Sequence, residues 1–96
     1  MRVLFAALAL TLPTPAAAQQ GQALFAAQCA ACHQRDPRAP AAELAQRAPQ
    51  NFAAFARIVR NGESPSGEMP AFTTDELSDA DLRALHAYLQ SVRARR

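Results

Sequence analysis

The stretch "QCAACHQRDP", from Gln28 to Pro37, decides how the rest of the chain is interpreted. It contains both cysteines of the 96-residue chain, Cys29 and Cys32, and the histidine that follows them, His33. Two thiols at this spacing near the end of a helix lie on nearly the same side of it. They can bond to the two vinyl groups on one edge of a porphyrin, and the next residue then reaches the iron. This spacing, C-x-x-C-H, is the attachment signature of c-type haem.

Three other uses of these residues compete with haem attachment. A disulfide between Cys29 and Cys32 would close a loop so short that it restrains the unfolded chain little. A thioredoxin-like thiol oxidoreductase needs a βαβ context, and the sequence has no strand pattern. A zinc site built from the two cysteines, His33 and His86 would leave Met69 and the long loops without a role. We therefore expect one haem c, attached covalently through Cys29 and Cys32.

The composition also favours a cofactor. Half of the residues are hydrophobic, but alanine supplies much of that fraction, tryptophan is absent and Tyr88 is the only tyrosine. Because alanine favours helices but buries little area, the core that these side chains build alone is thin. Chains of this size usually need a metal, a cofactor, disulfides or a partner. The net charge is only +2 and the arginines form no concentrated basic face, so we expect no nucleic-acid partner.

The first residues have the features of a cleaved secretory signal peptide. Arg2 precedes an apolar run from Val3 to Leu12, and an A-x-A cleavage pattern ends at Ala18. The run is about ten residues long, well short of the roughly twenty that span a bilayer. We expect residues 1–18 to be removed and residues 19–96 to form a single exported domain in the periplasm, without a membrane anchor.

The rest of the chain is expected to be all-α, with three main helices joined by proline-bearing loops. Apolar residues recur at helical spacing over about 20–32, 51–61 and 78–93, and a short helix is expected over about 41–47. Asn51 and Ser78 are candidate N-caps, and the last arginines suit the end of a helix. The loops are too long and too rich in proline for a simple bundle, so we expect them to wrap around the haem.

Met69 is the expected second iron ligand. It is the only methionine after residue 18, and it lies in the loop sequence "GEMPAF" beside Pro70, which stiffens the backbone there. His86 is the other candidate, but it lies near the boundary of the apolar face of the last helix, where we expect a partly exposed residue. Ligation by histidine and methionine raises the reduction potential of cytochromes c. We expect His33 and Met69 to be the metal ligands, and we expect no catalytic residues.

The chain resembles the class I cytochrome c family in its small single-haem bacterial form. The resemblance covers nearly all of the chain after residue 18 and is carried by "GQALFAAQCAACH", "IVRNG", "MPAF" and "LSDADLRALHAYLQSV". It implies a class I cytochrome c fold in which the first and last helices cross closely. Gly21 and Phe25 would meet Leu85 and Tyr88 at that crossing, with the glycine allowing close approach.

The resemblance also implies the family's ligand set. The two cysteines would hold the haem, His33 would be the proximal ligand and Met69 the distal one. Family members often have a proline after the haem motif whose carbonyl accepts a hydrogen bond from the proximal histidine. Pro37 and Pro40 both compete for this role, and Pro40 is favoured. The lysines that surround the haem edge in the family have no counterpart, because this chain has no lysine.

The function that the resemblance implies is that of an electron carrier rather than an enzyme. The protein would shuttle single electrons between redox protein partners, such as a dehydrogenase, a membrane cytochrome complex or a terminal oxidase, or serve as the haem subunit of a periplasmic dehydrogenase. Exposed apolar atoms from Met69 to Phe72 are the expected docking patch. The alternatives are a five-coordinate haem protein that binds a gas or peroxide, if Met69 is no ligand, and a thiol oxidoreductase that uses Cys29 and Cys32.

Overall fold

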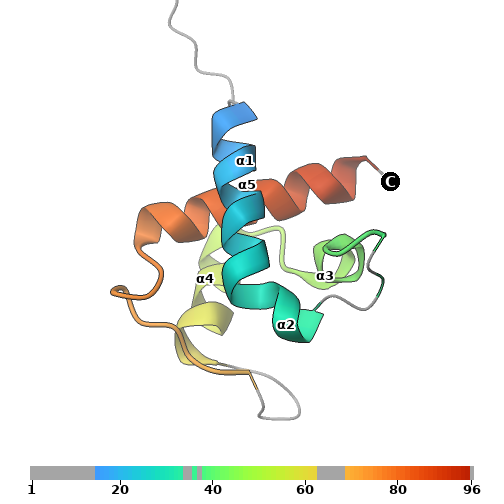
Figure 1. Ribbon diagram of the computed structural model, residues 1–96. Helices are drawn as coiled ribbons and strands as arrows, with labels where there is room; N and C mark the ends of the chain where they lie inside the picture. The colour runs from blue at the N-terminus through green and yellow to red at the C-terminus, as the bar shows by residue number, and fades with distance from the viewer. Residues whose placement is uncertain (1–14, 34–35, 37, 63–68, 96) are drawn as a thin grey trace, which may run out of the picture.

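The computed structural model describes residues 15–33, 36, 38–62 and 69–95 (Figure 1). In chain order its helices are α1 (Pro15–Leu24), η1 (Phe25–Cys29), α2 (Ala30–His33), α3 (Ala42–Arg47), α4 (Phe52–Asn61) and α5 (Asp79–Ala94). No strand occurs among these described residues, and the expected all-α fold is confirmed. Most of the expected signal peptide lies outside them.

α1, η1 and α2 form one continuous helical segment. A helix was expected over about 20–32, but the segment begins earlier, at Pro15, whose fixed φ suits the first turn of a helix. η1 is a π-helical turn, after which the N–H of Ala30 donates to the carbonyl of Phe25. Single π turns inside α-helices occur frequently at functional sites. The expected cleavage point after Ala18 falls inside α1, and cleavage there stays a prediction.

α1 crosses α5 at close range (Figure 1). Gly21 is buried at this crossing, and a Cβ atom placed on it would lie 2.6 Å from the Cβ of Tyr88 and against the carbonyl of Ala84. The rings of Phe25 and Tyr88 pack beside it with their centroids 6.1 Å apart. The expected contact of Gly21 and Phe25 with Tyr88 is therefore confirmed. Ala84, one turn before Tyr88 on the same face of α5, is nearer to the glycine than the expected Leu85.

The ends of α4 and α5 are fixed by local caps. The side chain of Asn51 accepts a hydrogen bond from the N–H of Ala54 at 2.9 Å, and α4 ends at Gly62, which has a φ of 67°. At the start of α5 the hydroxyl of Ser78 accepts from the N–H of Asp81, whose carboxylate accepts from the N–H of Ser78. This reciprocal capping box satisfies two backbone donors. Both helices thus begin where the sequence predicts.

α5 supplies more of the buried apolar side chains than any other helix. Leu82, Leu85 and Leu89 are at most 1% exposed, and Leu77, which precedes the helix, is fully buried. The core cluster is completed by Phe25, Ala41, Ala45, Ala48, Phe55, Val59, Tyr88 and Val92. Several of these are small, in keeping with the thin core expected from the composition. In the part of the chain that the structure describes, every helix is too short or too polar to cross a membrane.

Candidate functional site

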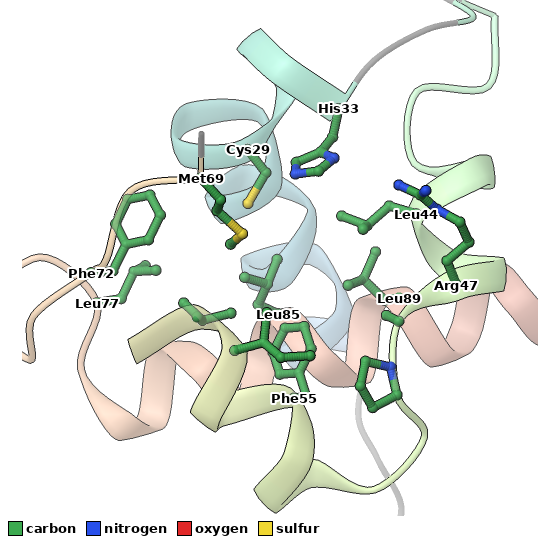
Figure 2. A pocket seen from close by; sticks show the side chains of 14 residues that line it. Cys29, His33, Leu44, Arg47, Phe55, Met69, Phe72, Leu77, Leu85 and Leu89 are labelled. Atoms are coloured by element: carbon green, nitrogen blue, oxygen red, sulfur yellow. The ribbon is translucent and has the colours of Figure 1, made fainter. Parts of the chain in front are cut away.

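The core surrounds a cavity of about 310 Å³, shown in Figure 2. Its walls come from the end of the first helical segment, from α3, α4 and α5, and from the loop that begins at Met69. The lining residues are Cys29, His33, Leu44, Arg47, Ala48, Pro49, Phe55, Ile58, Val59, Met69, Phe72, Leu77, Leu85 and Leu89. Most of the lining is apolar, so a ligand held here would be an apolar body with a small number of specific contacts.

His33 and Met69 converge on this cavity from different parts of the chain. His33 is the last residue of α2, and Met69 lies in the loop between α4 and α5. Both are half-buried, and Figure 2 shows the imidazole and the thioether turned toward the same space. An imidazole nitrogen and a thioether sulfur are an axial ligand pair found in cytochromes c. The fold therefore brings together the two donors that the sequence analysis selected.

The two cysteines differ in their surroundings. Cys29 is half-buried and lines the cavity close to both donors (Figure 2), whereas Cys32 is exposed and does not line it. Both are free thiols. Burial raises the pKa of the Cys29 thiol to about 11, because the apolar wall disfavours the thiolate. Cys29 therefore presents a neutral sulfur to the cavity at ordinary pH.

His86 lies outside the cavity. Its Nε2 atom is 3.0 Å from the carbonyl oxygen of Pro49, and its ring packs on Phe55 and Phe52 at centroid distances of 4.9 and 5.6 Å. The residue is half-buried, in keeping with the partly exposed position expected of it. Within the described residues, no group of three or more histidine, cysteine, aspartate or glutamate side chains could hold a metal ion.

Arg47 is a site residue that the sequence analysis missed. It ends α3 and is the one charged side chain among the described residues that line the cavity, although the residue as a whole is exposed. Pro40, the favoured partner of His33, lines a separate hollow with Asp36 and Glu43 instead of this cavity. Its competitor Pro37 lies outside the described residues.

The expected docking patch from Met69 to Phe72 is only partly on the surface. Pro70 and Ala71 are exposed, while Met69 and Phe72 are half-buried and line the cavity from the other side. Residues that line the cavity and residues that face solvent are therefore adjacent in this short loop. Its use in docking stays a prediction.

An all-α fold in which an imidazole, a thioether and a thiol meet in an apolar cavity is that of a class I c-type cytochrome. A family model described as "Cytochrome C oxidase, cbb3-type, subunit III" matches residues 16–89 of the chain. The match covers the haem motif, Met69 and most of α5, and the chain belongs to this family of c-type cytochromes. The resemblance to class I cytochrome c is thus confirmed, and membership indicates haem-based electron transfer. No solved structure matches the chain.

Proposed function

We propose that the protein is an exported mono-haem c-type cytochrome that transfers single electrons between redox proteins. The observation that supports this most is the convergence of His33 and Met69 on one apolar cavity beside Cys29 (Figure 2). The donor set fits a haem c: two thiols for the vinyl groups, an imidazole and a thioether for the iron, and apolar walls for the porphyrin. When bound, the haem supplies an iron that alternates between the ferrous and ferric states.

Each site residue has a separate task toward the haem. Cys29 and Cys32 would hold it through thioether bonds, and His33 and Met69 would be its proximal and distal ligands. Arg47, as the cation at the cavity, would face the haem carboxylates. A protein this small would leave part of the haem exposed to solvent. The two thioether bonds would keep the haem attached where burial alone would not.

The protein tunes the electron transfer through its ligands and its walls. A thioether ligand opposite histidine raises the reduction potential. The leucines, valine and phenylalanines of the cavity exclude water, which disfavours the more highly charged oxidised state. His33 and Met69 come from separate parts of the chain. If both held the iron in its two oxidation states, little would have to rearrange when an electron arrives or leaves.

The proposed partners are redox proteins at the membrane or in the periplasm. The matched family is described as an oxidase subunit, which favours a terminal oxidase or another membrane cytochrome complex as electron acceptor. A dehydrogenase would be the donor. A free carrier and a haem subunit share this chemistry but differ in how firmly they bind their partner protein. A carrier binds weakly, because transient electron-transfer complexes use small interfaces. Co-purification from detergent extracts separates them: a subunit stays with its enzyme, and a carrier elutes alone.

Export is part of the proposal and has its own test. The intact mass of the haem protein recovered from the periplasmic fraction should match residues 19–96 plus one covalently bound haem. Recovery with residues 1–18 still attached in the membrane fraction would show a retained anchor and contradict cleavage.

The ligand assignment is tested by visible absorption spectra of the haem-containing protein. The wild type should have sharp reduced bands of a low-spin c-type haem and, when oxidised, the weak iron–sulfur band of methionine ligation. Met69→Ala should lose that band and bind small external ligands, whereas His86→Ala should keep it because His86 is outside the cavity. A high-spin wild type would move the function toward ligand binding. Absence of haem from the purified protein would refute haem attachment and favour the thiol oxidoreductase that uses Cys29 and Cys32.

A further inference from the structure

Arg60 connects α4 to both ends of the segment that follows Met69. Its Nη1 atom donates to the carbonyl of Phe72 at 3.1 Å and to the carbonyl of Leu77 at 2.6 Å. Its Nη2 atom donates to the carboxylate of Asp79 at 2.8 Å. The Arg60 side chain is only 20% exposed, so water competes little with its bonds to the two carbonyls, whereas the Asp79 carboxylate is 84% exposed. One guanidinium thus holds three points of the segment against a single helix.

A second set of contacts joins the same end of α4 to the start of the segment. The N–H of Phe72 donates to the carbonyl of Val59 at 3.0 Å. Gly62 has a φ of 67°, and a Cβ atom placed on it would lie 2.7 Å from the carbonyl oxygen of Met69 and 2.9 Å from the nitrogen of Ala71. The backbone of Met69 to Ala71 therefore rests directly on the glycine that ends the helix. Only a residue without a side chain permits this approach.

We propose that Arg60 is the positioning residue for Met69. The inference rests on the proposed function, in which the Met69 sulfur is the distal iron ligand. Because Phe72 is bonded to α4 through its N–H, which donates to Val59, and through its carbonyl, which accepts from Arg60, the chain three residues after Met69 is held close to α4. Met69 itself has a flexible side chain with three rotatable bonds, so its location depends on this backbone.

The chemistry of the guanidinium explains why an arginine occupies this position. Its donors form a planar fork, which here reaches two carbonyls through one nitrogen and a carboxylate through the other. A lysine has a single ammonium on a flexible stem and cannot reproduce a fixed fork. Without Arg60, the carbonyls of Phe72 and Leu77 lose the donor that the structure gives them. The segment would then separate from α4 more often, and the thioether would move with it.

Binding of external imidazole to the ferric haem protein measures this opening. Imidazole occupies the distal position only when Met69 has left, so its apparent affinity rises with the population of the open state. We expect Arg60→Gln to bind imidazole at least tenfold more tightly than the wild type. Arg60→Lys should lie between the two, since it restores the charge and some of the bonds. Asp79→Asn, which alters only the exposed acceptor, should have the smallest effect.

Two control variants separate positioning from charge and from stability. Arg95→Gln removes the same charge at the exposed end of α5 and should leave imidazole affinity unchanged. Asn51→Ala removes the cap at the other end of α4 and should lower the melting temperature without raising imidazole affinity. Equal imidazole affinity in Arg60→Gln and the wild type would overturn the proposal. So would an Asn51→Ala variant that matches Arg60→Gln in both measurements.

The failure of this inference is distinguishable from the failure of the proposed function. A wild type that lacks the iron–sulfur band and binds imidazole as tightly as Met69→Ala would refute Met69 ligation, whatever Arg60 does. A wild type with the band, whose imidazole affinity is the same in Arg60→Gln, would keep the ligand and refute the positioning role. If Arg60→Gln does not accumulate as haem protein, Arg60→Lys and Asp79→Asn are used to test the proposal instead. Imidazole affinity unchanged from the wild type in both variants would count against it.

Discussion

Replacing Gly21 by alanine tests the crossing of α1 and α5. In an isolated helix this change stabilises by at most about 1 kcal/mol, because alanine has the higher helix propensity. Here the added methyl would lie 2.6 Å from the Cβ of Tyr88 and against the backbone carbonyl of Ala84. Overpacking costs about 1–3 kcal/mol, and the upper end applies because a backbone carbonyl moves only if the helix moves. Separation of α1 from α5 would also weaken the contact between the rings of Phe25 and Tyr88, which is worth roughly 1 kcal/mol.

Overpacking less the gain in helix propensity leaves a net loss of about 2 kcal/mol, opposite in sign to the propensity effect alone, and a weakened Phe25–Tyr88 pair would add to it. For a domain of this size it corresponds to a melting temperature lower by about 8–16 °C. Thermal unfolding of the haem-containing variant, followed by far-UV circular dichroism, measures it. Gln22→Ala, at the next and exposed position of α1, is the matched control and should change little. A Gly21→Ala variant as stable as the wild type, or more stable, would refute the close crossing.

Three further predictions concern charge, capping and pH. Arg47→Gln should lower the reduction potential, measured by voltammetry, because losing a cation at the cavity favours the oxidised state. An interaction of about 0.2–1 kcal/mol with an exposed charge corresponds to roughly 10–40 mV, and the control Arg95→Gln should leave the potential unchanged. Ser78→Ala should lower the melting temperature by about 4–8 °C, because it removes an N-cap worth about 1 kcal/mol, and equal melting curves would contradict the cap. In the haem-free chain the pKa of Cys29 is about 11, so the unfolded thiol ionises first and stability should fall as pH rises from 9.0 through 11. In haem-free Cys29→Ala the urea midpoint should not fall over this pH range. If the midpoints of the variant and the wild type fall equally with pH, the Cys29 thiol is not the cause.

The sequence predicts helices and donors well where the signal is local or rare. Asn51 and Ser78 cap their helices through groups only three residues away, so the boundaries of α4 and α5 follow from short-range chemistry. His33 was selected because it follows the two cysteines directly, and Met69 because it is the only methionine after residue 18 and lies beside a proline in a loop. Both side chains line one cavity, and their role as iron ligands stays a prediction.

Arginines carry no such signal in this sequence. All ten basic residues are arginine, and nothing near Arg60 indicates that it bonds to groups 12, 17 and 19 positions away. Arg47 was expected only as the end of a short helix, and its place at the cavity depends on how α3 packs. The π turn η1 was also missed, because a single extra residue in a helical turn leaves the apolar spacing almost unchanged. These features are set by tertiary packing, which sequence periodicity does not encode.

The contacts that hold Met69 have a consequence for how this protein can vary in length. In the part of the chain that the structure describes, the backbone that follows Met69 is held by bonds and contacts with the end of α4. Doubling the length of such a connection costs only about 0.6 kcal/mol in loop closure. Insertions between Gly62 and Met69 should therefore be tolerated while the ligand stays in register. A binding peptide inserted there should leave the spectrum of the haem protein unchanged.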